Sequence, residues 1–129
     1  MKLIIAEKPS VAKAIYTVLG ATEKKKGYME GCGYYVSWCY GHLAGLYSPN
    51  DYSGNWADSW SFSQLPMIPE TWKLKTFEKT QEQFSILKNL MEKSDVNEII
   101  CATDADRDGE YIFRYVYELA DCHKPVKRL

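Results

Sequence analysis

Residues 98–110 read EIICATDADRDGE, a short apolar segment followed by four carboxylates within seven residues. The length and composition of residues 98–103 predict a buried strand. Beyond the acidic stretch the spacing of apolar residues predicts a helix, whose apolar stripe consists of Ile112, Phe113, Val116, Leu119 and Ala120. The order is therefore strand, acidic loop, helix.

The N-terminal residues have the same order of strand, loop and helix. Residues 3–6, LIIA, are an apolar run that ends in Glu7-Lys8-Pro9-Ser10, and apolar residues then recur at helical spacing as far as Gly20. Pro9 suits the first helical turn, where a missing N–H costs nothing, and Gly20 suits the position after the last turn. Alternating strands and helices predict an α/β domain with a mostly parallel sheet flanked by helices.

The segment that follows the first helix has the composition of strands and not of another helix. Residues 27–30 and 34–40 predict two strands joined around Gly31-Cys32-Gly33 as a hairpin. Residues 23–27, EKKKG, predict a charged surface turn before it.

Helical spacing is lost from about residue 41 to residue 75, which predicts a long loop insertion. Of the 18 aromatic residues, 11 fall between Tyr28 and Trp72. Two interpretations stay open for these rings: they stack on bases of single-stranded nucleic acid, or they anchor the loop to the core or to another domain. Helical spacing returns over residues 77–93, and residues 125–129 have the composition of another strand.

The composition is that of one folded domain. The 129 residues are 46% hydrophobic and carry a net charge of -1, so bulk charge does not draw the chain to a polyanion. The longest apolar runs are a few residues and no signal region follows Met1, which favours a cytoplasmic location without a membrane span. We expect a single domain over residues 1–129, cut from a larger protein. The four cysteines have no paired spacing and are interpreted as buried thiols: Cys32, Cys39, Cys101 and Cys122.

The acidic loop predicts a cation site. Carboxylates this close repel one another at the end of an apolar strand, and oxygen ligands without histidine or cysteine favour a hard cation, with Mg²⁺ as the default. The pattern Asp-x-Asp-x-Asp-Gly also opens an EF-hand calcium loop, but Tyr115 stands in place of the required Glu and a strand precedes Asp104. A purely structural acidic cluster is the remaining alternative.

Carboxyl ends of parallel strands meet at one edge of a sheet. Glu7 ends the first strand and Asp104 follows a later one, so adjacent strands would bring Glu7, Lys8 and the acidic loop together. A carboxylate for proton transfer, a metal that neutralises phosphate charge and an ammonium group that stabilises developing charge suit phosphodiester chemistry.

AEKPS at 6–10 together with TDADRDGE at 103–110 resembles the Toprim domain, which type IA and type II topoisomerases, bacterial primases and some nucleases share. The chain is similar in particular to type IA topoisomerases of the topoisomerase III kind, because VSWCYGHLAGL at 36–46 and LPMIPETWKLK at 65–75 follow MKLIIAEKPSVAKAI in the same order. The resemblance covers nearly the whole chain. It implies a Toprim fold with a mostly parallel sheet of about four strands flanked by helices.

The resemblance also implies the site residues. Glu7 corresponds to the family's catalytic glutamate, which gives a proton to the leaving 3′ oxygen on cleavage and accepts it on resealing, and Lys8 contacts the phosphate. Asp104, Asp106 and Asp108 occupy the metal positions, with Glu7 beside them. The family generally has Glu at the third position, so the shorter arm of Asp108 favours water-mediated coordination.

Three further residues lie in family-like stretches. Glu110 matches the last acid of the motif and is a metal ligand, an outer partner or a helix cap. Arg107 contacts DNA phosphate or pairs with its acidic neighbours. His42, in GHL, faces the site or is a structural residue.

In the enzymes that the chain resembles, a tyrosine of a later domain attacks DNA and forms a 5′-phosphotyrosyl link. None of the ten tyrosines here lies in a matching motif. The implied parent enzyme relaxes negatively supercoiled DNA with Mg²⁺ and without ATP, binding a single-stranded segment with its remaining domains, and the chain alone is inactive. The alternatives are a nuclease or primase-type Toprim domain, and a non-catalytic module that docks nucleic acid or protein.

Overall fold

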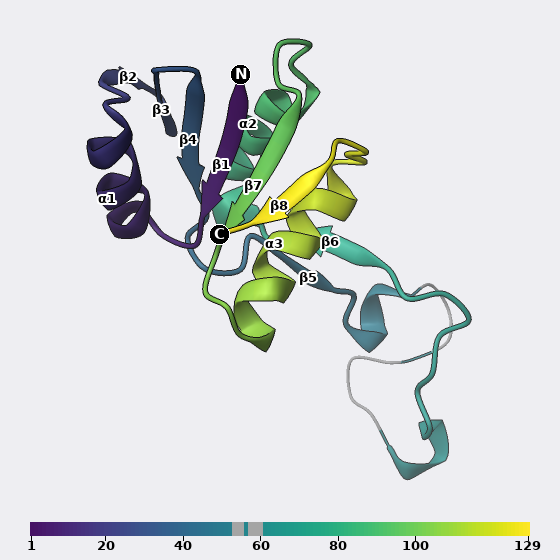
Figure 1. The fold of residues 1–129 in the computed structure, drawn as a ribbon. Coiled ribbons are helices and arrows are strands. Elements are labelled where there is room, and N and C mark those ends of the chain that lie inside the picture. Colours follow the sequence, from purple (N-terminus) through teal and green to yellow (C-terminus); the bar gives the residue numbers. More distant parts are fainter. Residues whose placement is uncertain (53–55, 57–60) are drawn as a thin grey trace.

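The structure is a computed structural model that describes residues 1–52, 56 and 61–129. Among these residues a six-stranded sheet has the order β2-β3-β4-β1-β7-β8, and β5 and β6 form a separate two-stranded sheet (Figure 1). The strands and α-helices are β1 (Lys2–Ala6), α1 (Pro9–Leu19), β2 (Glu23–Lys25), β3 (Tyr28–Gly31), β4 (Tyr34–Trp38), β5 (Ala44–Leu46), β6 (Leu74–Thr76), α2 (Gln81–Glu92), β7 (Glu98–Ala102), α3 (Arg107–Leu119) and β8 (Val126–Arg128). Short 3-10 helices cover Pro49–Asp51, Phe62–Gln64 and Glu78–Thr80.

The predicted α/β sheet is confirmed, and within it only β2 was not predicted. β4, β1, β7 and β8 are parallel and match the expected sheet of about four strands, whereas β2 and β3 extend it through antiparallel pairs. The prediction of a charged turn at residues 23–27 is wrong for Glu23–Lys25, which pair with β3, and the turn itself is confined to residues 26–27. These three side chains are exposed, and charges of this kind protect an edge strand from pairing with another chain.

The predicted hairpin is confirmed as β3 and β4, which pair with Gly31 opposite Tyr34. Cys32 lies in the turn with a φ of 50°. Its side chain is exposed, so the interpretation of Cys32 as a buried thiol is wrong, because the turn places it outside the core. Cys39, Cys101 and Cys122 are free and buried, as predicted.

The segment from residue 41 to residue 75 is not wholly a loop. β5 and β6 pair antiparallel, so the two ends of the segment lie side by side. Between them the ring of Tyr52 lies 5.3 Å from that of Tyr47 and 5.6 Å from that of Trp56. Residues 53–55 and 57–60, Trp60 among them, lie outside the described residues. Strands of three residues are too short to show a period of two, which is why the sequence did not predict them.

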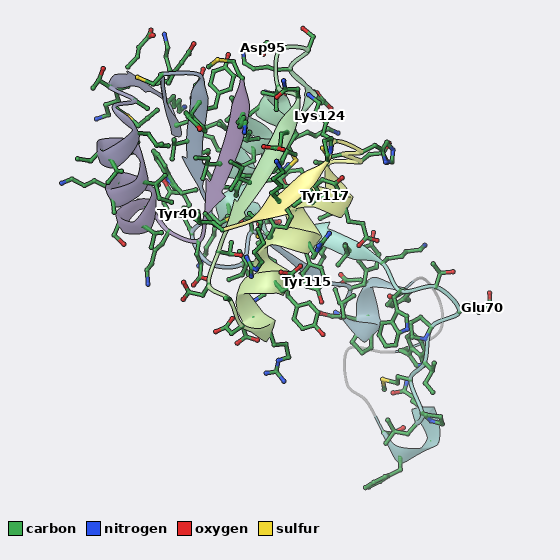
Figure 2. The ribbon with its side chains drawn as sticks, in the orientation of Figure 1. Tyr40, Glu70, Asp95, Tyr115, Tyr117 and Lys124 are labelled. Atoms are coloured by element: carbon green, nitrogen blue, oxygen red, sulfur yellow. The ribbon has the colours of Figure 1, made fainter. Side chains whose placement is uncertain are left out.

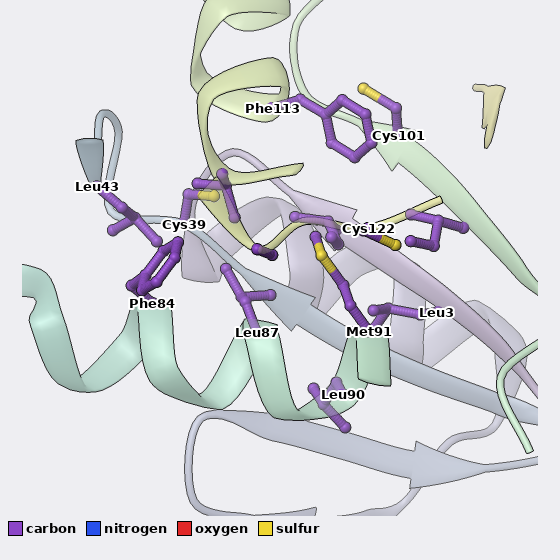
Figure 3. Close-up of a cluster of buried hydrophobic side chains, with 14 of the residues drawn as sticks. Leu3, Cys39, Leu43, Phe84, Leu87, Leu90, Met91, Cys101, Phe113 and Cys122 are labelled. Atoms are coloured by element: carbon purple, nitrogen blue, oxygen red, sulfur yellow. The ribbon is translucent and has the colours of Figure 1, made fainter. Parts of the chain in front are cut away.

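Alternate side chains of β1 serve two hydrophobic clusters on opposite faces of the sheet. Leu3 and Ile5 pack with buried side chains of α2 and α3, among them Leu87 (Figure 3). Ile4 and Ala6 pack in a second cluster that includes residues of α1. This alternation follows from the pleat of a strand that is covered on both faces. In the described part of the chain, no helix has both the length and the apolar composition needed to cross a membrane.

The larger cluster sets the stability of the domain. Leu87 is fully buried, so we expect Leu87→Ala to lower the free energy of unfolding by about 2–5 kcal/mol, since it removes apolar contacts and leaves a cavity. Val18 is 87% exposed, and Val18→Ala is the matched control, with an expected effect within about 0.5 kcal/mol. Urea unfolding measures both; similar losses for the two variants would contradict this assignment of the core.

Glu98, on β7, forms ion pairs with a lysine of β1 on one side and a lysine of the edge strand β8 on the other. Its carboxylate lies 3.0 Å from Lys2 Nζ on β1 and 2.8 Å from Lys127 Nζ on β8, and its side chain is 15% exposed. Hydrogen bonds from Lys127 and Lys2 hold the pKa of Glu98 below its usual value. The ionised form is therefore favoured by folding.

This pKa shift makes stability depend on pH. Because the pKa of Glu98 is lower in the folded than in the unfolded chain, its contribution is complete above the unfolded value and is lost as pH falls through the folded value. We expect Glu98→Gln to destabilise the domain at about pH 7 and to have less effect at about pH 3. Urea unfolding at both pH values, with Glu92→Gln as the control, checks this; an equal loss at both would show that the effect is not electrostatic.

Candidate active site

The candidate site forms where β1 and β7 end side by side. The two strands pair in register, with Ala6 opposite Ala102, so the chain leaves both strands at the same edge of the sheet. Glu7 Oε2 accepts a hydrogen bond from the N–H of Asp104, with 3.0 Å between the two atoms. The expected proximity of Glu7 to the acidic loop is therefore present in the structure.

Asp106 and Gly109 shape the acidic loop. Asp106 is the N-cap of α3, and its Oδ1 accepts a hydrogen bond from the N–H of Gly109 at 2.7 Å. A Cβ added at Gly109 would lie 2.1 Å from the carbonyl oxygen of Asp104, so the loop requires glycine at this close approach. Asp106 thus has a structural task besides the metal role predicted for it.

Arg128 on β8 holds the backbone of the loop, and sequence reasoning missed it. Its Nη2 donates to the carbonyl oxygen of Asp104 at 2.8 Å, and its Nη1 donates to the carbonyl oxygen of Thr103 at 3.2 Å and to Sγ of Cys101 at 2.9 Å. The available signal was a basic residue in the predicted strand 125–129. The contact of this residue with the acidic loop depends on the pairing of β8 with β7, which the sequence alone does not reveal.

Three further charged residues of the loop, Arg107, Asp108 and Glu110, form ion pairs. Arg114 Nε donates to Glu110 Oε1 at 2.7 Å, and Arg128 lies 3.2 Å from Glu110 Oε2. Both oxygens of Glu110 therefore meet a cation, which favours a supporting role over direct metal ligation. Arg107 pairs with Asp108 at 3.5 Å, with side chains 81% and 70% exposed.

Lys8 follows Glu7 in the chain, and a backbone hydrogen bond brings His42 near Glu7. Lys8 is the exposed N-cap residue of α1, and its carbonyl oxygen accepts from the N–H groups of Val11 and Ala12. The N–H of Gly41 donates to the carbonyl oxygen of Glu7 at 3.2 Å, which places the next residue, His42, near this edge. His42 is exposed, and its ring lies 6.4 Å from that of Tyr115 on α3.

Cys39 borders the site without joining its chemistry. Its N–H donates to the carbonyl oxygen of Ala6 at 2.8 Å. Burial, helped by the nearby Cys101 and Glu7, raises the pKa of its thiol to about 12. The thiol is therefore protonated at neutral pH, which agrees with the structural role predicted for it.

The oxygen donors at this edge are of the kind that Mg²⁺ prefers. In the described residues no three His, Cys, Asp or Glu side chains converge closely enough to enclose a metal. Mg²⁺ commonly takes only one or two carboxylates and completes its shell with water and substrate phosphate. Glu7 and the acidic loop offer carboxylates alone, so the donor set suits a site that a bound phosphate completes.

The fold and the site define an α/β domain whose carboxylates gather at the carboxyl ends of adjacent parallel strands. The Toprim domain family model matches residues 2–129, so the chain belongs to the Toprim family. The resemblance seen in the sequence is thereby confirmed.

The chain is also similar to individual proteins named DNA topoisomerase 3. The chain is 43% identical over 128 residues to DNA topoisomerase 3 of Shouchella clausii strain KSM-K16. It is 44% identical over 127 residues to DNA topoisomerase 3 of Bacillus subtilis strain 168 and to that of Bacillus anthracis. These matches cover 98–99% of this chain but 17% of each relative, so the chain spans about one-sixth of the length of the curated relatives it matches.

Capping by Asp106 can be separated from metal binding. We expect Asp106→Ala to lower the free energy of unfolding by about 1 kcal/mol, because the N–H of Gly109 loses its acceptor. Asp106→Asn keeps an acceptor oxygen, so its stability should stay within about 0.5 kcal/mol of the wild type. Urea unfolding without metal compares the two variants; equal stability of both would mean that the cap contributes nothing.

Proposed function

We propose that this chain is the metal-binding catalytic Toprim domain of a type IA DNA topoisomerase, which cleaves and reseals single-stranded DNA with Mg²⁺ and without ATP. The observation that carries the proposal is the contact of the Glu7 carboxylate with the N–H of Asp104 at 3.0 Å, which joins Glu7, the residue before Lys8, to the acidic loop. Identity of 43–44% to proteins named DNA topoisomerase 3 supports it.

The chain's own residues have distinct tasks in this proposal. Glu7 donates a proton to the 3′ oxygen that leaves when the strand is cut and takes it back on resealing. The Lys8 ammonium group binds the phosphate at the cleavage point. Glu7, Asp104, Asp106 and, through water, Asp108 hold the metal, and bound Mg²⁺ supplies neutralisation of the phosphate charge.

Other parts of the reaction come from outside this chain. The proposed nucleophile is a tyrosine of another domain, since none of the ten tyrosines here lies in a matching motif. The same remaining domains pass one strand through the other, so that the whole enzyme relaxes negative supercoils. Because the proposed substrate is DNA, the proposed location is the cytoplasm, and the chain alone does not complete a turnover.

A magnesium titration tests the proposal. We expect Mg²⁺ to shift the amide signals of residues 103–110 in NMR spectra, and Asp104→Ala to weaken this binding by at least about 10-fold, because it removes an oxygen donor. Glu118→Ala, which removes an exposed carboxylate further along α3, is the matched control and should bind as the wild type does.

The same samples also enter a plasmid-relaxation assay. Magnesium binding that depends on the carboxylates, without plasmid relaxation, agrees with a domain that needs a tyrosine from another domain. Equal binding by Asp104→Ala and the wild type would contradict the metal role of the loop. Relaxation by this chain would show that one of its own tyrosines is the nucleophile.

A further inference from the structure

Two tyrosines on α3 stack outside the hydrophobic core. The rings of Tyr111 and Tyr115, one helical turn apart, lie 5.4 Å from each other with 13° between their planes. The ring of His42 lies 6.4 Å from that of Tyr115 with 42° between the planes. We call these three residues the aromatic ladder; Figure 2 shows Tyr115 projecting from α3.

The core does not account for Tyr111. Its side chain is 45% exposed, whereas the buried residues of α3 are Gly109, Ile112, Phe113 and Val116. An exposed ring stacked on a second ring presents a flat apolar face to solvent, which is the form of a platform for a nucleobase.

The aromatic ladder begins beside the candidate active site. Tyr111 lies four residues after Arg107, the first residue of α3, so it is about 6 Å further along the helix axis. At the other end of the ladder, His42 follows Gly41, whose N–H donates to the carbonyl oxygen of Glu7. A base on the ladder would therefore belong to a nucleotide near the phosphate held by the carboxylate edge.

The charges around the ladder favour a base over a phosphate as the bound group. Arg114 is paired with Glu110, and Arg107 with Asp108, so the two cations that flank Tyr111 in the chain each have an anionic partner. A surface of this kind has no excess of positive charge to attract a phosphate. A neutral, flat base gains stacking energy without needing that charge.

We infer that the aromatic ladder stacks a base of the single-stranded DNA whose phosphate lies at the carboxylate edge. Tyr111 provides the exposed face, Tyr115 stacks on its ring, and His42 lies beside Tyr115. The inference rests on the proposed function, because it assumes that the edge binds a DNA strand. It assigns to α3 the positioning of a nucleotide next to the cleavage point.

The test compares two strands and is read as a ratio. Binding of this chain to a fluorescent oligothymidine and to an abasic strand of equal length is measured by anisotropy with Mg²⁺ present. We expect the wild type to prefer the base-bearing strand by about 10-fold. Tyr111→Leu should abolish this preference without weakening the abasic strand, whereas Tyr111→Phe should retain it. Thermal unfolding confirms that the variants are folded.

Matched variants separate the inference from the function on which it rests. Trp72→Leu, at an aromatic that is 61% exposed outside the ladder, should keep the preference, and Lys8→Ala should weaken both strands equally. If Tyr111→Leu prefers the base-bearing strand as strongly as the wild type does, the inference is overturned and the proposed function stands. Loss of the preference in Trp72→Leu alone places the bases on the 41–75 segment and also overturns it. A wild type that binds neither strand overturns the inference alone, because the remaining domains also take part in DNA binding and the magnesium titration tests the proposed function separately.

Discussion

The parallel register between β1 and β7 is the constraint on which the candidate site depends. β1 is central, and its alternate side chains fill clusters on both faces, so its register is fixed from two sides. A shift of one residue would exchange Leu3 and Ile5 with Ile4 and Ala6 between the faces. It would also take Glu7 away from the N–H of Asp104, a contact between residues 97 positions apart. The packing of apolar side chains therefore determines where the polar groups meet.

The acidic loop keeps its shape through contacts within the protein. The carboxylate of Asp106 accepts from the N–H of Gly109, and that of Glu110 meets Arg114 and Arg128. Asp108 pairs with Arg107 in a more exposed ion pair. Hydrogen bonds to charged groups are among the stronger ones in proteins. Asp106 and Glu110 therefore act first on the geometry of the loop.

The sequence predicted the parts of this domain whose signals are local. The strands at 3–6 and 98–103 are apolar runs, and the helices have a clear apolar period. The rule that parallel strands end at one edge predicted that Glu7 lies beside Asp104 if the two strands are adjacent, and the structure shows that they are. β2, β5 and β6 have three residues each, too few for a period, and were missed. The role of Arg128 was missed for another reason: it arises from the pairing of β8 with β7, and charge in a short strand does not reveal its partner. The stacking of Tyr111 on Tyr115 was visible only as a spacing of four, which an exposed helix face also shows by chance.

Helix α3 connects the hydrophobic core, the acidic loop and the aromatic ladder, because a different part of the helix contributes to each. Its buried side packs Ile112, Phe113 and Val116 into the core, which fixes the helix relative to β7. Its first turn, capped by Asp106, sets the path of the acidic loop. Tyr111 and Tyr115 lie on a face that neither of these tasks requires. A helix held rigidly by its core and its cap is a suitable support for a stacking surface, since a base bound there loses freedom without any rearrangement of the protein. The same packing that places the carboxylates therefore also fixes the distance between them and the aromatic ladder.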